Sequence, residues 1–176
     1  ARGFGIPVPS FSHEVVTLWY RPPDVLLGST VYGTAIDIWS IGCIMAEFYS
    51  NGLPLFPGRN NHDQLKRIFK VLGTPSRETW NDLMPSGQRV PQWVHHISKY
   101  DKPSIPQTLS TIFPLCDKTS IDLMSRLLDY RPEYRISAVD ALSHPYFSTH
   151  TSMLKKKKAQ LNVLETPCSS GGLNRV

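Results

Sequence analysis

Cysteine is scarce in this sequence, and its spacing excludes small cross-linked folds. The three cysteines, Cys43, Cys116 and Cys168, lie far apart and form no Cys-x-x-Cys pair. Disulfide frameworks and structural zinc sites both need paired or clustered thiols. An ordinary apolar core must therefore stabilise the fold, and unpaired thiols suit a reducing compartment.

Long apolar runs are absent too. The longest, residues 41–46, is far shorter than the roughly 20 residues that cross a bilayer. The first residues also lack the basic-then-apolar pattern of a signal peptide. We therefore expect a soluble protein of the cytoplasm and nucleus, without a membrane partner.

An acidic excess is lacking, and the formal net charge is +5. Most of this charge lies near the end of the chain, because residues 1–147 contain 14 Lys and Arg against 13 Asp and Glu. A nucleic-acid surface would need a basic patch on the folded part, so we predict no nucleic-acid partner. The run Lys155–Lys158 is compatible both with a solvated tail and with a nuclear localisation signal.

Apolar residues recur at helical spacing in five segments of the chain. This spacing predicts helices over residues 35–50, 62–72, 76–84, 119–129 and 137–142. The first is apolar on all sides, which is typical of a buried helix. Ser76 and Ser137 are predicted N-caps, and Asp140 completes a capping box with Ser137.

The remaining segments read as loops. Residues 1–34 show no periodicity, and residues 85–114 contain five prolines, which predicts a long irregular insert. His95 and His96 lie in this insert, but adjacent side chains point apart and no carboxylate or cysteine pattern joins them, so we predict no metal site. Residues 148–176 are polar and lysine-rich, which predicts a disordered tail. The predicted fold is mainly α, with helices joined by long loops.

Two strings carry a resemblance to a known family. Residues 13–24, His-Glu-Val-Val-Thr-Leu-Trp-Tyr-Arg-Pro-Pro-Asp, resemble the end of the activation segment of eukaryotic protein kinases. Residues 37–43, Asp-Ile-Trp-Ser-Ile-Gly-Cys, resemble the helix that anchors the kinase C-lobe. Shorter strings at residues 54–58, 73–75 and 135–138 follow in the family order. Together they resemble the cyclin-dependent protein kinases.

The resemblance implies the C-lobe of the kinase fold without its ATP-binding half. Residues 1–34 correspond to the activation segment and the P+1 loop, which contacts the substrate residue after the phosphorylated one. Residues 35–147 correspond to the helical subdomain, in which residues 85–114 occupy the place of a group-specific insert. The Gly-rich loop, the strand Lys, the helix Glu, the H-R-D-x-x-x-x-N loop and D-F-G are absent from these 176 residues. We therefore expect the C-terminal part of a longer kinase, without its N-lobe and catalytic loop.

By resemblance, the P+1 pocket consists of Val15, Val16, Leu18, Trp19 and Arg21. In this kinase group the pocket selects proline, which has no backbone N–H to leave unpaired. The implied activity of the parent is transfer of the γ-phosphate of ATP, with Mg²⁺, to Ser/Thr-Pro sites in proteins. We expect no catalytic residue in this fragment, and no binding of ATP or Mg²⁺ by the fragment alone.

Four further residues receive supporting roles from the resemblance. Thr17 matches a threonine that hydrogen-bonds the catalytic aspartate, and Asp37 matches a carboxylate that accepts hydrogen bonds from the catalytic loop. Without the resemblance, the residues alone favour the interpretation that Asp37 is a carboxylate at a helix start, where negative charge is stabilising. Asp24, in Pro22-Pro23-Asp24 instead of the family's Ala-Pro-Glu, is expected to form a buried structural ion pair with Arg135.

Regulation is implied at the start of the chain. Ser12 lies where the family carries its activating phosphosite, and Arg2 matches an arginine that would bind the phosphate. An unmodified loop serine remains an open alternative. Residues 2–6 resemble part of the surface bound by a cyclin, so a cyclin or cyclin-like activator is the implied partner, besides protein substrates. The alternative function is a non-catalytic binding module that titrates cyclins or substrates.

Overall fold

A computed structural model describes residues 18–29, 33–83, 91–97, 99 and 105–148. The described residues form helices and connecting turns, with no strand among them. In chain order the helices are η1 (Leu18–Tyr20), α1 (Pro23–Leu26), α2 (Ala35–Tyr49), α3 (Asn61–Leu72), α4 (Arg77–Leu83), η2 (Gln92–His96), α5 (Ile105–Ile112), α6 (Lys118–Leu127), η3 (Pro132–Tyr134) and α7 (Ala138–Leu142). None of these helices is both long and apolar enough to cross a membrane.

The mainly helical fold and its longer helices are confirmed. The predicted helices correspond to α2, α3, α4, α6 and α7, within one or two residues at each end. The predicted cap at Ser137 is present, since its Oγ accepts a hydrogen bond from the N–H of Asp140 at 3.1 Å. The Ser76 hydroxyl likewise accepts one from the N–H of Thr79 at 3.2 Å.

Two loop predictions were wrong in part. Within residues 1–34 the chain forms η1 and α1, and α1 begins at Pro23, whose fixed φ suits a helix start. All four residues of α1 are buried, so tertiary packing stabilises a helix too short to show a periodicity. The insert contains η2 and α5, where Thr108 and Leu109 are buried. The proline in the first turn of α5 indicated irregular chain, although that position tolerates proline.

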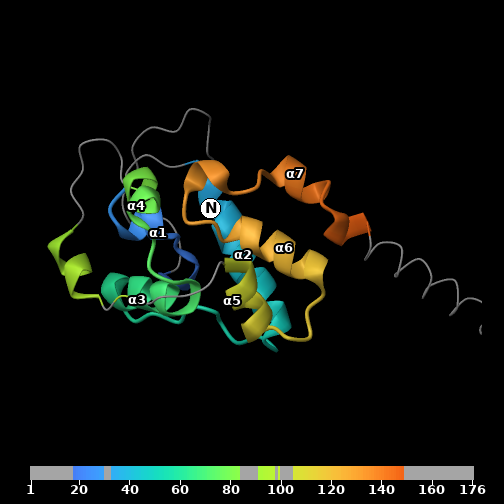
Figure 1. The fold of residues 1–176 in the computed structure, drawn as a ribbon, viewed down its shortest axis with the longest axis horizontal. Helices are drawn as coiled ribbons and strands as arrows, with labels where there is room; N and C mark the ends of the chain where they lie inside the picture. Colours follow the sequence, from blue (N-terminus) through green and yellow to red (C-terminus); the bar gives the residue numbers. More distant parts are fainter. Residues whose placement is uncertain (1–17, 30–32, 84–90, 98, 100–104, 149–176) are drawn as a thin grey trace, which may run out of the picture.

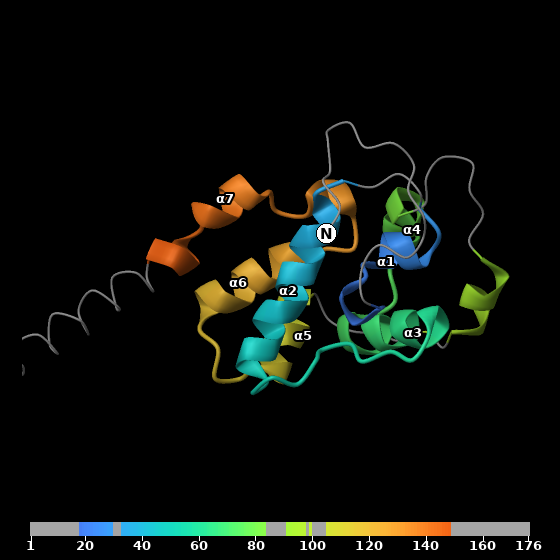
Figure 2. The same ribbon diagram turned by 180° about the vertical axis from the view of Figure 1, so that it is seen from behind.

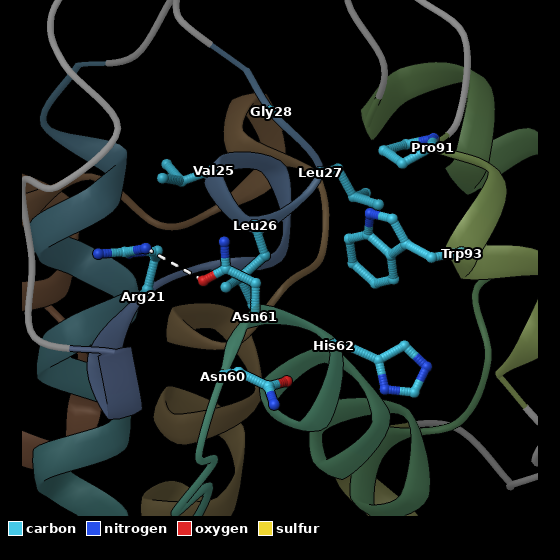
Figure 3. A pocket seen from close by; sticks show the side chains of 10 residues that line it. All are labelled: Arg21, Val25, Leu26, Leu27, Gly28, Asn60, Asn61, His62, Pro91 and Trp93. Atoms are coloured by element: carbon cyan, nitrogen blue, oxygen red, sulfur yellow. Dashed lines mark hydrogen bonds between the residues drawn. The ribbon is translucent and has the colours of Figure 1, made fainter.

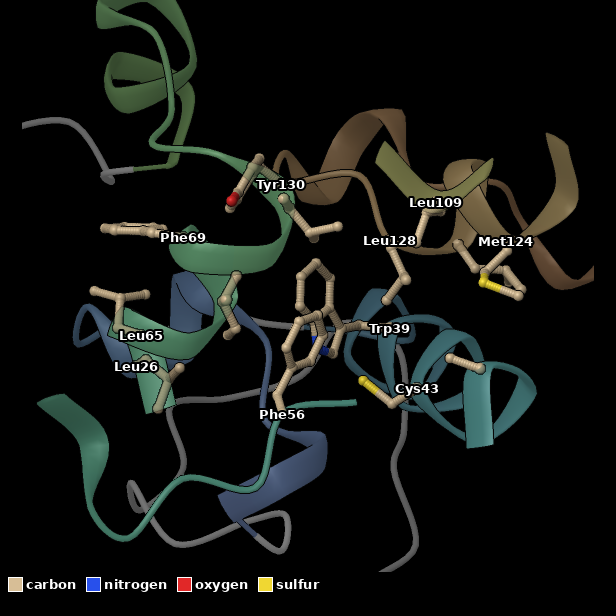
Figure 4. Packing of buried hydrophobic residues seen from close by; sticks show 14 of the residues in the cluster. Leu26, Trp39, Cys43, Phe56, Leu65, Phe69, Leu109, Met124, Leu128 and Tyr130 are labelled. Atoms are coloured by element: carbon tan, nitrogen blue, oxygen red, sulfur yellow. The ribbon is translucent and has the colours of Figure 1, made fainter. Parts of the chain in front are cut away.

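Helix α2 lies in the middle of the helices. Figures 1 and 2 show α1, α3 and α4 on one side of α2 and α6 and α7 on the other, while α5 overlaps α2 in both views and contacts both α3 and α6. The core between the helices centres on Trp39, whose ring stacks on Phe56 with 6.0 Å between ring centres. Figure 4 shows Trp39 beside Phe56 and Cys43 within this cluster. Helix α2 approaches α6 closely because Gly42 has no side chain, and a Cβ there would lie 2.9 Å from Leu128.

Helix α2 is not buried on all sides, which corrects the prediction for residues 35–50. Asp37, Ile41, Ile44 and Phe48 follow one another at helical spacing on the face opposite Gly42, and all four are exposed. Phe48 is 80% exposed and Ile41 is 50% exposed. The apolar composition of α2 therefore combines a core face with an open apolar face.

Helix α6 begins at a strong cap. The Asp117 carboxylate accepts hydrogen bonds from the N–H groups of Thr119 at 2.9 Å and Ser120 at 3.0 Å, and also from the Ser120 hydroxyl at 2.6 Å. The hydrogen bonds from Ser120, followed by those from Thr119, hold the pKa of Asp117 well below its usual range. The ionised carboxylate is therefore the form that caps the helix.

We expect Asp117→Ala to lower the free energy of unfolding by about 1 kcal/mol at neutral pH, because α6 loses its cap. A folded-state pKa below the unfolded value gives a stabilisation that is present above about pH 4 and is lost as the pH falls further. Urea unfolding between pH 7 and pH 2.5 should therefore show the difference from the wild type shrinking below about pH 4. Asp117→Asn, which keeps an acceptor oxygen without the charge, is the control, and a difference that stays constant to pH 2.5 would contradict the assignment.

Candidate functional site

The described end of the predicted P+1 loop is fixed between α2 and α3. The indole N–H of Trp19 donates to the carbonyl of Gly58 at 2.9 Å, and the side-chain amide of Gln64 donates to the carbonyl of Trp19 at 3.1 Å. The Ser40 hydroxyl of α2 donates to the carbonyl of Tyr20 at 3.0 Å. Side chains of α2 and α3 thus hold the backbone of η1, and the carbonyl of Gly58, before α3, holds the Trp19 side chain.

Gln64 is the centre of this arrangement, and it was not predicted as a site residue. Its side chain is fully buried, and its Oε1 accepts a hydrogen bond from the N–H of Gly58 at 2.9 Å. A Cβ at position 58 would lie 2.6 Å from the Cα of Gln64, so only glycine allows this approach. The signal in the sequence was a polar residue one turn before Ile68 on the apolar face of α3.

Arg21 directly follows η1 and lines a pocket. Its side chain is 9% exposed, and Nη1 donates to Oδ1 of Asn61 at 3.2 Å. The adjoining pocket has a volume of about 760 Å³. Figure 3 shows the residues that line it: Arg21, Val25, Leu26, Leu27, Gly28, Asn60, Asn61, His62, Pro91 and Trp93.

The chemistry of this pocket is that of a binding surface. Val25 and Leu26 supply an apolar wall, and the rings of His62 and Trp93 meet edge to face with 5.6 Å between their centres. No carboxylate, thiol or hydroxyl side chain is among the lining residues. The pocket can therefore hold an apolar group and hydrogen-bond to polar atoms at its edge.

The residues that the sequence analysis paired, Asp24 and Arg135, are in contact. Nη2 of Arg135 lies 2.6 Å from Oδ1 of Asp24, and the two side chains are 0% and 5% exposed. The same guanidinium donates to three backbone carbonyls, those of Ala35 at 3.1 Å, Asp129 at 2.9 Å and Tyr130 at 3.0 Å. A buried charge with this many acceptors is compensated on every side.

Asp37 stands apart from this network. It lies in the first turn of α2 and is exposed, and its side chain makes no hydrogen bond with another described residue. Its role in supporting a catalytic loop therefore stays a prediction. Five other predicted site residues lie outside the described part of the chain: Arg2, Ser12, Val15, Val16 and Thr17.

The residues present do not fit Mg-ATP. A protein kinase holds the nucleotide with a Gly-rich loop and a lysine, and its metal ions with the D-F-G Asp and the catalytic-loop Asn. These motifs do not occur in the sequence. Among the described residues, no three His, Cys, Asp or Glu side chains gather in a way that could hold a metal ion.

We expect Arg135→Met to lower the free energy of unfolding by about 3–5 kcal/mol, because it leaves Asp24 buried without its partner. Asp24→Asn should cost less, since Arg135 keeps its three carbonyls. The double variant Asp24→Leu/Arg135→Met should recover part of the loss, because no buried charge remains unpaired. Urea unfolding measures all of these values.

The matched control for this prediction is Arg126→Met. Arg126 lies 3.0 Å from Asp122, but the two side chains are 55% and 46% exposed, so its removal should cost less than about 1 kcal/mol. Equal losses for Arg126→Met and Arg135→Met would show that burial does not set the strength of the Asp24 pair.

One comparison with known proteins bears on this arrangement. A family model described as the protein kinase domain matches residues 5–147. This match contains the segment Trp19–Arg21 with its hydrogen bonds, the ion pair of Asp24 with Arg135 and all of the described helices. The chain belongs to the protein kinase family.

Proposed function

We propose that this chain is the C-terminal, substrate-binding part of a proline-directed Ser/Thr kinase of the cyclin-dependent group. In the intact parent, the γ-phosphate of ATP passes to Ser/Thr-Pro sites of protein substrates, and the present chain alone transfers none. The observation that carries the proposal is the braced segment Trp19–Arg21, held by Gly58, Gln64 and Asn61.

Phosphate transfer depends on positioning, so the surface under the substrate must be rigid. The segment Trp19–Arg21 meets this requirement because a buried amide side chain, Gln64, fixes its backbone. Trp19 is 41% exposed although its indole N–H is bound to Gly58. An aromatic ring whose polar edge is already satisfied is suited to contact an apolar ring such as that of proline.

The open face of α2 supports the view that the chain works as part of a larger unit. Ile41, Ile44 and Phe48 expose apolar surface beside Asp37, and exposed apolar patches on soluble proteins mark contact surfaces. We infer that the ATP-binding half and catalytic loop of the parent cover this face, with Asp37 accepting hydrogen bonds from the loop. We also propose that a cyclin-like activator binds the parent protein and that Ser12 is its regulatory phosphosite.

A second candidate, the non-catalytic binding module, rests on the same open face, because an apolar surface can also hold a separate partner. The P+1 segment favours the kinase, since a module that only titrates a cyclin does not need a braced substrate surface. Phosphate transfer to a peptide distinguishes the two candidates.

We expect the longer protein that contains this chain to phosphorylate a Ser-Pro peptide at least about tenfold better, in kcat/KM, than the matching Ser-Ala peptide. The reason is that alanine leaves an unpaired N–H, which costs about 1–3 kcal/mol when buried. Residues 1–176 alone should label neither peptide. Equal rates with both peptides would refute the proline preference, and labelling by the isolated chain would refute its inactivity.

We further expect Gln64→Leu in that longer protein to raise KM for the Ser-Pro peptide by about tenfold, because the substrate surface loses its brace. The KM for ATP should not change, since Gln64 lies under the peptide surface. Lys66→Leu is the control, because Lys66 is exposed on the same helix. An unchanged peptide KM in a folded Gln64→Leu protein would refute the proposed role of Gln64 in holding the substrate-binding segment.

A further inference from the structure

A second groove lies between α3 and α5, which contact each other and are neighbours in Figure 1. It has a volume of about 470 Å³. Its lining, called here the α3–α5 groove, consists of Leu55, Arg67, Lys70, Val71, Thr108, Thr111 and Ile112. It shares no residue with the pocket in Figure 3 or with the brace around Gln64.

The floor of the α3–α5 groove is apolar and partly open to solvent. Leu55 and Val71 are half-buried, and Ile112 is 41% exposed. The two chain segments that supply this apolar surface also carry exposed leucines, because Leu53 is 69% exposed and Leu115 is fully exposed. The apolar floor of Leu55, Val71 and Ile112 favours a protein partner over a small ion.

The rim of the groove is positively charged. Arg67 and Lys70 come from α3, and no acidic residue is among the lining residues. Nε of Arg67 lies 2.9 Å from Asp63, whereas Lys70 is exposed and has no ion-pair partner among the described residues. Helix α5 contains no charged residue, so nothing on the opposite wall neutralises this charge.

Hydroxyl groups line the α5 side of the groove. The Thr111 hydroxyl donates its hydrogen to the carbonyl of Gln107 at 3.1 Å, so its oxygen can still accept a hydrogen bond from a ligand N–H. The groove thus combines an apolar floor, a cationic wall and a wall that can accept hydrogen bonds. A peptide backbone that carries apolar and acidic side chains matches all three features.

We propose that the α3–α5 groove binds an acidic, leucine-containing segment of a partner protein. Leucine side chains occupy the floor formed by Leu55, Val71 and Ile112, and carboxylates pair with Lys70 and with the edge of Arg67. This docking is independent of phosphate transfer, because the groove lies apart from the braced segment Trp19–Arg21. Its failure and the failure of the proposed function are therefore separate results.

The test is fluorescence anisotropy with a labelled peptide in which two leucines alternate with aspartate and glutamate, titrated with the chain of residues 1–176. Lys70→Glu should weaken binding about five- to tenfold, because it replaces an attraction by a repulsion. Ile112→Asp should weaken it by about tenfold or more, because it places a charge on the apolar floor. Replacing the peptide leucines by alanine should weaken binding to the same extent as Ile112→Asp.

Lys66→Glu is the matched control, because it makes the same change of charge on an exposed residue of α3 outside the groove. It should change the affinity less than twofold at physiological salt, where screening limits distant charges. Equal effects of Lys66→Glu and Lys70→Glu would overturn the proposal, since they would indicate attraction to the whole helix. The absence of binding by the wild-type chain would also overturn it.

A fatty acid is the other occupant that an apolar groove with a cationic rim could take. Oleate is therefore added to the complex of peptide and chain. If the labelled peptide stays bound when oleate is added at the peptide concentration that saturates the groove, the peptide is supported as the ligand. Displacement by oleate at concentrations well below that of the peptide, lost in Lys70→Glu, would overturn the proposal in favour of a lipid site.

Discussion

The buried guanidinium of Arg135 is the interaction on which the rest of the structure depends. Its acceptors come from three separate stretches of the chain: the carboxylate of Asp24 and the carbonyls of Ala35, Asp129 and Tyr130. A single cation thereby fixes α1, the start of α2 and the segment after α6 relative to one another. A buried charge needs all of its partners, so these three stretches keep one arrangement. Fixing α1 also fixes the position of the loop that precedes it.

The position of that loop gives the site its character. Trp19 and Arg21 lie directly before α1, and α3 supplies Gln64 and Asn61 to hold them. Residues of α3 therefore hold this segment in one position. This arrangement suits a protein kinase, in which the peptide surface and the nucleotide site belong to different parts of the domain.

The two faces of α2 explain why its sequence is apolar throughout. One face packs on α6 at Gly42, where the helices approach closely, and the other exposes Ile41, Ile44 and Phe48. Periodicity detects the contrast between a polar and an apolar side, so it cannot separate a buried face from an apolar face that is open. The prediction of a fully buried helix was wrong for this reason.

The sequence by itself determined the family, the longer helices and the caps at Ser76 and Ser137, because each depends on residues close together in the chain. Ser137 and Asp140 are such a case, since a cap needs only its own first turn. The caps Asn60 of α3 and Asp117 of α6 were not predicted. Only the tertiary structure decided that Gln64 braces Trp19, that α1 and α5 are helical, and that Lys70 faces an apolar groove. These features join residues far apart in sequence, and helices as short as α1 gain their stability from packing rather than from local propensity.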